Sequence, residues 1–175
     1  MDKSVNKGIP EKVLKLNNQP MELCIPFRFR ASHSLSVRED VHFHDWGLKV
    51  FLSRKVYRGE LFVVDILEIR KLIQPVLDSM EGKNLNDQFN IPTCEYLCRY
   101  FMSSITHGLK MLKSANEINE EVELVAIQVD LIESEQSDEH KEWGSVKLMN
   151  PWTVSYTHLR AHETRHDLVC RLLLE

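Results

Sequence analysis

Alternation of apolar and polar residues predicts two long β-strands in the first third of the chain. In residues 21–32, Phe27, Phe29 and Ala31 fall on one side of an extended backbone, while arginine and serine residues fall on the other. Residues 41–57 repeat the pattern with the apolar positions Trp46, Leu48, Val50 and Leu52. We therefore expect two strands that each bury one side and that pair as a hairpin.

Helical spacing replaces this alternation from Asp65 onward. Asp65, with Glu68 three positions later, resembles the aspartate form of a capping box at a helix start. The apolar residues that follow at helical spacing are Ile66, Ile69, Ile73, Val76, Leu77 and Met80. Pro92 and Thr93 are typical of a second helix start, and the apolar stripe after them contains Cys94, Leu97, Cys98, Phe101, Ile105 and Leu109.

Two further strands are predicted later in the sequence, at residues 123–132 and 143–148. The order strand, strand, helix, helix, strand, strand favours an α+β domain in which an antiparallel sheet carries both helices on one face. We assign this domain to residues 21–153. Residues 1–20 are polar and contain two prolines, and we expect them to form a loose leader.

Residues 154–175 match a different kind of sequence. Residues 154–164, VSYTHLRAHET, resemble the translation of a transposase-type sequencing-library adapter, and residues 168–174, LVCRLLL, match the adapter's continuation. We interpret this tail as adapter read-through and exclude it from the fold. Its three histidines would share one face of a helix and imitate a zinc site, and we attribute them to adapter codons.

Composition and charge narrow the class of protein. The chain has 175 residues, 43% of them hydrophobic, and a net charge of −4, which is typical of a folded globular domain. No apolar run approaches the ~20 residues of a membrane helix, and the absence of a basic stripe argues against nucleic acid as a partner. Four cysteines do not make a disulfide framework, so we expect a cytoplasmic protein. Cys94 and Cys98 are interpreted as core residues.

Three histidines carry the strongest chemical signal. His42 and His44 lie two apart in a predicted strand, so their side chains share one face. His33 continues the parity of the apolar residues of the preceding strand and comes near them if the hairpin forms. Three imidazoles and one open position make a zinc site of the catalytic type. The alternative is a surface strand with ordinary exposed histidines.

Four segments in succession resemble the motifs of the 6-pyruvoyl-tetrahydropterin and 6-carboxytetrahydropterin synthases. They are FRFRASHSL, VHFH, GELFVVDILEIRKLIQPVLDSMEGKNLND and IPTCEYLCRYF, and the resemblance extends over residues 21–132. It implies the tunnelling fold: a four-stranded antiparallel sheet with two helices on one face. It also implies a homo-oligomer, because subunits of this family join into barrels, commonly hexamers of two trimers.

The resemblance also implies a site and a substrate. His33, His42 and His44 match the family's zinc ligands. In that family zinc holds and acidifies the side-chain hydroxyls of a dihydroneopterin triphosphate. The remaining matches concern the pterin: Thr93 and Glu95 in the P-T-x-E motif, and Asp130, with Glu133 as an alternative, as the carboxylate that anchors the ring.

The chain departs from the family pattern in two places that matter for catalysis. No cysteine lies between His33 and His42, but Glu39 stands three residues before His42. This resembles the family variant in which glutamate is the base and the product is 6-hydroxymethyl-dihydropterin; the alternative is a solvated loop acid. The Asp-His pair of the family's proton relay falls on Glu81 and Gly82, so a carboxylate is kept and an imidazole is missing.

We therefore expect a zinc-dependent carbon–oxygen lyase that acts on the side chain of 7,8-dihydroneopterin triphosphate. One alternative is a non-catalytic paralogue that binds zinc and a pterin. The other is an oligomeric structural protein whose histidines bind nothing.

Overall fold

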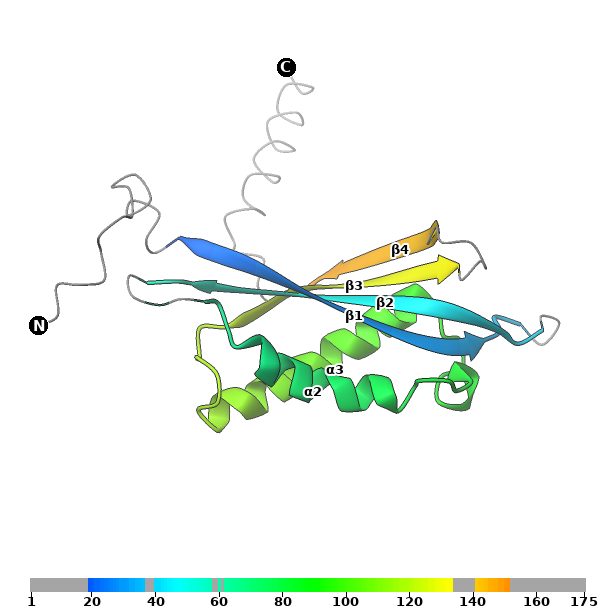
Figure 1. Ribbon diagram of the computed structural model, residues 1–175, viewed down its shortest axis with the longest axis horizontal. Helices are drawn as coiled ribbons and strands as arrows, with labels where there is room; N and C mark the ends of the chain where they lie inside the picture. Colours follow the sequence, from blue (N-terminus) through cyan, green and yellow to red (C-terminus); the bar gives the residue numbers. More distant parts are fainter. Residues whose placement is uncertain (1–18, 37–39, 58–59, 61, 134–140, 152–175) are drawn as a thin grey trace, which may run out of the picture.

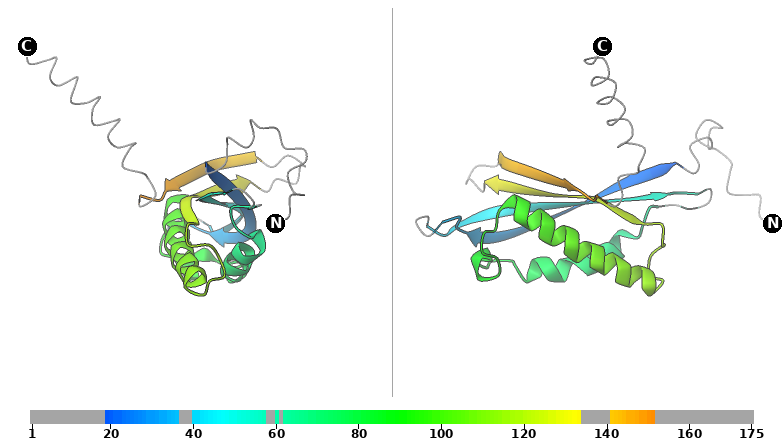
Figure 2. Two further views of the ribbon diagram at one scale, coloured as in Figure 1. Left: turned by 90° about the vertical axis from the view of Figure 1, so that its left-hand side faces the viewer. Right: turned by 180° about the vertical axis from the view of Figure 1, so that it is seen from behind.

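The computed structural model describes residues 19–36, 40–57, 60, 62–133 and 141–151. The elements in chain order are β1 (Pro20–His33), β2 (His42–Lys55), α2 (Ile66–Asp78), the 3-10 turn η1 (Leu85–Asp87), α3 (Cys94–Ser114), β3 (Glu123–Glu133) and β4 (Lys141–Met149). The strands form one antiparallel sheet in the order β1-β2-β3-β4, and both helices lie on the same face (Figures 1 and 2). The predicted fold class and element order are confirmed.

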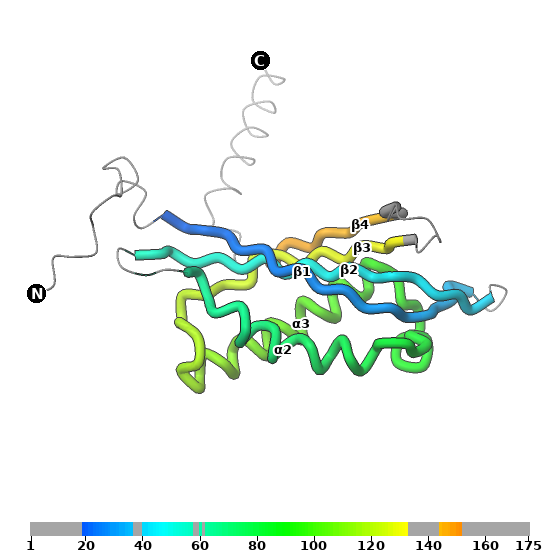
Figure 3. The backbone as a smooth tube through the Cα atoms, in the orientation of Figure 1, coloured from blue at the N-terminus to red at the C-terminus, as the bar shows by residue number. Residues whose placement is uncertain are grey.

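The hairpin of β1 and β2 sets the register of the sheet. His33 pairs with His42 and Ala31 pairs with His44, so the two strands run side by side along their whole length (Figure 3). The β2–β3 pairing shifts between Phe51 and Leu52, which marks an irregularity in an otherwise continuous ladder.

The core lies between the sheet and the two helices. Phe29 of β1 stacks on Trp46 of β2 with 6.1 Å between ring centroids, and it meets Phe101 of α3 edge-on at 6.2 Å. Trp46 is fully buried, and its indole N–H donates to the carbonyl of Ala31 at 3.2 Å. The buried side of the hairpin therefore follows the alternation in the sequence and leads directly to the histidines.

The helix starts follow the capping residues read from the sequence, with one difference. Asp65 Oδ1 accepts from the Leu67 N–H at 2.8 Å, and Thr93 Oγ1 accepts from the Tyr96 N–H at 3.3 Å. Glu68 pairs with Lys71 Nζ at 2.7 Å, because a lysine three residues on competes for its carboxylate. The expected capping box is thus wrong in its second half. None of the helices in the described ranges is long and apolar enough to span a bilayer.

Candidate metal centre

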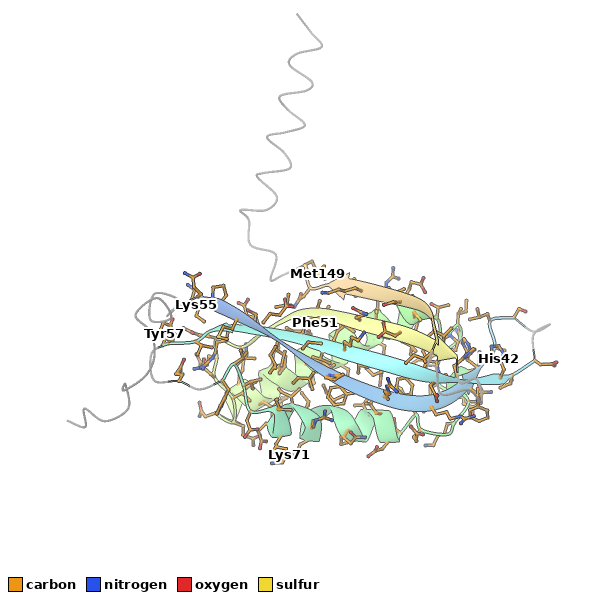
Figure 4. All side chains as sticks on the ribbon, turned by 45° about the horizontal axis from the view of Figure 1, so that its top comes forward. His42, Phe51, Lys55, Tyr57, Lys71 and Met149 are labelled. Atoms are coloured by element: carbon orange, nitrogen blue, oxygen red, sulfur yellow. The ribbon has the colours of Figure 1, made fainter. Side chains whose placement is uncertain are left out.

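Three histidines converge at one end of the β1–β2 hairpin. One nitrogen from each of His33, His42 and His44 lies within 4.8 Å of the other two. The ring centroids are 5.1 Å apart for His33 and His42, 5.2 Å for His33 and His44, and 4.7 Å for His42 and His44. Strand parity places all three on the helix-covered face of the sheet. Figure 4 shows His42 at the end of the molecule opposite Lys55 and Tyr57.

Backbone carbonyls fix two of the rings and their tautomers. His33 Nδ1 lies 3.0 Å from the carbonyl oxygen of Pro92, and His42 Nδ1 lies 2.8 Å from that of Asp40. A carbonyl oxygen only accepts, so Nδ1 carries a proton in both rings, and in the neutral imidazole Nε2 is then the nitrogen that holds the lone pair. A protein that orients an imidazole as a metal ligand uses the same arrangement.

The environment of the trio also fits a metal ligand set. His33 and His44 are buried, at 4% and 7% exposure, and His42 is half-buried. Trp46 closes the inner side, with its ring centroid 5.1 Å from that of His33. Neutral imidazoles suit zinc, which bonds nitrogen at about 2.0–2.1 Å and leaves a position open for substrate when the protein supplies three ligands. The burial of these side chains argues against the alternative that they are ordinary exposed histidines on a surface strand.

Phe43, between the two histidines of β2, points away from them. Its side chain is exposed on the helix-free face, where the Arg30 guanidinium lies 5.6 Å from the centroid of its ring. The bulky side chain of Phe43 therefore leaves the space beside the histidines unchanged.

The structure does not bring Asp130 to the histidines of the same chain. Its strand partner Gly47 lies between the core residues Trp46 and Leu48, so Asp130 faces the helix-free side of the sheet. A Cβ at Gly47 would come 3.1 Å from Asp130 Oδ2, which shows how closely this carboxylate packs on β2. Asp130 and the histidines lie on opposite faces because of the register between β2 and β3, which the sequence of neither strand specifies alone.

Asp130 is instead a buried carboxylate at the centre of a polar cluster whose other members are half-buried or exposed. Lys49 Nζ lies 2.9 Å from its Oδ2, while Ser145 Oγ and Gln128 Nε2 donate to its Oδ1 at 2.6 and 2.8 Å. Burial alone would raise the pKa of this carboxyl group. The donors from Ser145, Gln128 and Lys49 outweigh burial and hold the pKa of Asp130 below its usual value.

The other predicted site residues lie at the start of α3, at the edge of β1 or outside the described part of the chain. Thr93 caps α3 directly after Pro92, and Glu95 is exposed in the first turn of that helix. Glu81 Oε2 accepts from the Arg30 N–H at 3.0 Å, which ties this carboxylate to the edge of β1. Glu39 and the side chain of Glu133 lie outside the described part of the chain.

The two cysteines of α3 behave as core residues. Cys98 is buried, and its thiol donates to the carbonyl of Val146 at 3.1 Å. Burial raises the pKa of Cys94 to about 11, and the neighbouring Glu95 carboxylate adds to the shift. At neutral pH both thiols are protonated and poorly nucleophilic.

A fold of the tunnelling type with three converging histidines defines the class of protein, and comparison with known sequences gives the family. A family model described as 6-pyruvoyl tetrahydropterin synthase matches residues 22–138. The chain belongs to this family.

Two curated relatives are similar over much of their length. A dihydroneopterin monophosphate aldolase from Pyrococcus furiosus is 26% identical over 83 residues, which is 46% of this chain and 71% of the relative. A putative 6-carboxy-5,6,7,8-tetrahydropterin synthase from Archaeoglobus fulgidus is 28% identical over 107 residues, or 59% of this chain and 92% of the relative.

Solved structures share the fold at lower identity. The 6-pyruvoyl tetrahydropterin synthase of Caenorhabditis elegans is 17% identical, with a TM-score of 0.57 over 77% of this chain and 98% of that one. The 6-pyruvoyl tetrahydropterin synthase of Plasmodium vivax is 14% identical, with a TM-score of 0.52 over 75% and 99%. These structures support the architecture of sheet and helices described above.

Proposed function

We propose that the protein is a zinc-dependent lyase that acts on the side chain of a phosphorylated 7,8-dihydroneopterin. The observation that carries this proposal is the convergence of His33, His42 and His44, with two of the rings oriented through Nδ1 by backbone carbonyls. A zinc ion bound there would supply a Lewis acid that holds and acidifies the hydroxyl groups of the substrate side chain.

Glu39 is the proposed general base. In the sequence it directly precedes Asp40, whose carbonyl contacts the ring of His42. Its role would be to take a proton from a side-chain hydroxyl, which a carboxylate does well when its surroundings favour the protonated form. One related Plasmodium vivax structure is a variant in which a catalytic glutamate is replaced by alanine, which supports a catalytic role for a glutamate here.

The substrate would lie between the histidines and the start of α3. Thr93 and Glu95 are the proposed pterin contacts, because Pro92 beside them already contacts His33. Asp130 faces the other side of the sheet, so a role for it in pterin binding requires a site formed with a second copy of the chain. The homo-oligomer implied by the family is therefore part of the proposal.

The name of the Pyrococcus furiosus relative favours one reaction within this class. An aldolase breaks a carbon–carbon bond, and aldol cleavage of the dihydroneopterin side chain leaves 6-hydroxymethyl-dihydropterin. The alternative products keep more of the side chain, as 6-pyruvoyl or 6-carboxy groups. A synthase of the 6-carboxy kind is represented by the Archaeoglobus fulgidus relative.

A non-catalytic paralogue is the second candidate, and the position of Gly82 favours it. Gly82 stands where the family's relay histidine is expected, and its φ of 69° is a backbone conformation that side chains rarely adopt. Loss of an acid–base imidazole costs about 10²–10⁴-fold in rate unless another group replaces it.

Metal content and product analysis test the proposal. We expect the full chain to bind one more equivalent of zinc than a variant in which His33, His42 and His44 are alanine, and this comparison cancels any metal held by residues 154–175. Incubation with dihydroneopterin monophosphate and triphosphate should then release 6-hydroxymethyl-dihydropterin. Equal zinc in the two proteins would contradict the proposal, and zinc-dependent pterin binding without turnover would favour the paralogue.

A further inference from the structure

The segment between α2 and α3, residues 82–92, contacts β1 at the strand's end, where His33 lies. Figure 1 shows this segment at the same end of the molecule as the last residues of β1. Its first part runs along the outer edge of β1: the Gly82 N–H donates to the carbonyl of Arg30 at 2.7 Å, and the Ser32 N–H donates to the carbonyl of Lys83 at 2.9 Å. Ser32 and Asn84 form a parallel bridge. Each contact precedes His33 along β1.

Asn86 holds the residue that follows His33. Its Oδ1 accepts from the Ser34 N–H at 2.8 Å, and its Nδ2 donates to the Ser34 carbonyl at 2.9 Å. The amide thus forms a two-bond clamp on the backbone of Ser34. Asparagine fits this role because one planar group offers an acceptor and a donor side by side.

The clamp is itself anchored in the core. Leu85 is 1% exposed and Phe89 is 6% exposed, and both belong to the main apolar cluster. Asn84 Oδ1 accepts from the Asn86 N–H at 3.1 Å, which fixes the turn that presents the clamp. The segment ends at Pro92, whose carbonyl oxygen accepts a hydrogen bond from His33 Nδ1. A single segment, anchored by the buried side chains of Leu85 and Phe89, therefore contacts the strand before His33, the residue after it and the ring itself.

We propose that Asn86 is a positioning residue for the metal centre, which it serves through Ser34 and His33. With the backbone fixed on both sides of His33, the ring has one placement in which Nδ1 meets Pro92 while Nε2 faces the other two histidines. This inference rests on the proposed function, because it assigns Asn86 to the zinc site proposed there.

Two variants of Asn86 and one matched control test this role. Asn86→Asp is nearly isosteric and replaces the Nδ2 donor with an oxygen that faces the Ser34 carbonyl; Asn86→Ala removes both bonds. Asn90→Ala is the control, since Asn90 is exposed in the same segment and makes no side-chain hydrogen bond to the described residues. Zinc affinity is measured by competition with a chelator, and the absorption spectrum of the cobalt-substituted protein reports ligand geometry.

We expect both Asn86 variants to bind zinc about 10–100-fold more weakly than the wild type, as for other groups that orient metal ligands. Their cobalt spectra should differ from the wild-type spectrum, while Asn90→Ala should match the wild type in both measurements. Wild-type affinity and spectrum in Asn86→Asp would overturn the inference while leaving the proposed function intact. A wild type that binds no zinc through the three histidines would overturn both.

Thermal unfolding separates positioning from general loss of stability. A destabilised variant far from the site, Gly108→Ala, serves as a second control because its substitution lies between the two helices. If Gly108→Ala lowers Tm as much as Asn86→Asp does and weakens zinc binding equally, the effect is global and Asn86 has no positioning role. A wild-type zinc affinity in Gly108→Ala at matched Tm supports the role.

Discussion

At the scale of single residues, strand parity alone places the three histidines on one face. His42 and His44 are two apart, and His33 continues the apolar parity of β1, so the sequence predicted their convergence once a hairpin was assumed. Asn86 gave no such signal, because its partner is the backbone of Ser34, 52 positions away. A bond from a side chain to a distant main chain depends on tertiary packing, which leaves no pattern in the local sequence.

The role of Glu39 as base can be tested by a change that keeps the shape of its side chain. Glu39→Gln removes the proton acceptor, and we expect kcat to fall about 10²–10⁴-fold while zinc content stays at the wild-type level. Asp40→Asn is the matched control, because the contact of Asp40 with His42 uses the backbone carbonyl. Full activity in Glu39→Gln would remove this residue from the mechanism.

Asp130 makes a pH-dependent contribution to stability. Its pKa is lowered on folding, so its contribution is complete above the ordinary carboxyl value of about 3.9 and is lost as pH falls through the lower folded value. We expect Asp130→Asn to reduce the free energy of unfolding by about 1–3 kcal/mol at neutral pH, because Lys49 loses its partner.

Urea unfolding of the wild type and Asp130→Asn between pH 3 and 7 measures this contribution, and the difference should shrink at the acid end. Asp45→Asn is the control, since Asp45 lies on the same face and the described residues give its side chain no hydrogen bond. A difference between wild type and Asp130→Asn that is constant over this pH range would contradict the assignment.

At the scale of elements, the sequence pattern located the four strands and two α-helices of the described residues, but not the 3-10 turn η1 or how the elements meet. The predicted second strand at 41–57 corresponds to β2 at His42–Lys55, and the helix after Asp65 corresponds to α2 at Ile66–Asp78. The face of Asp130 was missed because it depends on the pairing of β3 with Gly47, a register that neither strand specifies alone. Local rules therefore predicted the elements, while tertiary contacts decided the environment of the site.

The packing of α2 against α3 depends on Gly108, which has no side chain. A Cβ at Gly108 would lie 2.4 Å from Leu72 Cδ1 and 3.0 Å from Leu72 Cγ, so alanine there displaces Leu72. Overpacking of this kind costs about 1–3 kcal/mol, against a gain of about 0.8–1.0 kcal/mol in helix propensity. We expect Gly108→Ala to lower the free energy of unfolding.

A double-mutant cycle with Leu72→Ala isolates the clash. In the Leu72→Ala background the obstacle is gone, so Gly108→Ala should become stabilising by up to about 1 kcal/mol through helix propensity. Urea unfolding of the four proteins gives the coupling energy. The same effect of Gly108→Ala in both backgrounds would show that Leu72 is not what requires glycine at this position.

At the scale of the whole molecule, the sheet offers an open edge for assembly. β4 pairs with β3 on one side, and the described residues place no strand on its other side. The outer edge of β1 is partly covered by the bridge between Ser32 and Asn84. An uncovered edge strand pairs readily with another chain, which agrees with the homo-oligomer proposed above and makes β4 the expected contact.

Substitution of Lys147 by proline tests this contact through the backbone alone. The Asn150 N–H donates to Val125 in β3, and donor direction alternates along an antiparallel strand, so the Lys147 N–H points away from β3. Proline at position 147 removes that outward donor and spares the β3–β4 ladder, a replacement that edge strands tolerate. We expect Lys147→Pro to shift the oligomer to a smaller species in size-exclusion chromatography with light scattering.

Lys147→Ala is the control for the side chain, because it also removes the contact of Lys147 Nζ with the Phe51 ring, 3.8 Å from its centroid, but keeps the backbone donor. The alanine variant should therefore keep the wild-type mass, and the proline variant should keep a cooperative thermal transition as the smaller species. Equal masses for the two variants would mean that copies do not join through β4. A wild type that is monomeric at all concentrations would contradict assembly itself, and pterin binding by Asp130 would then have no site.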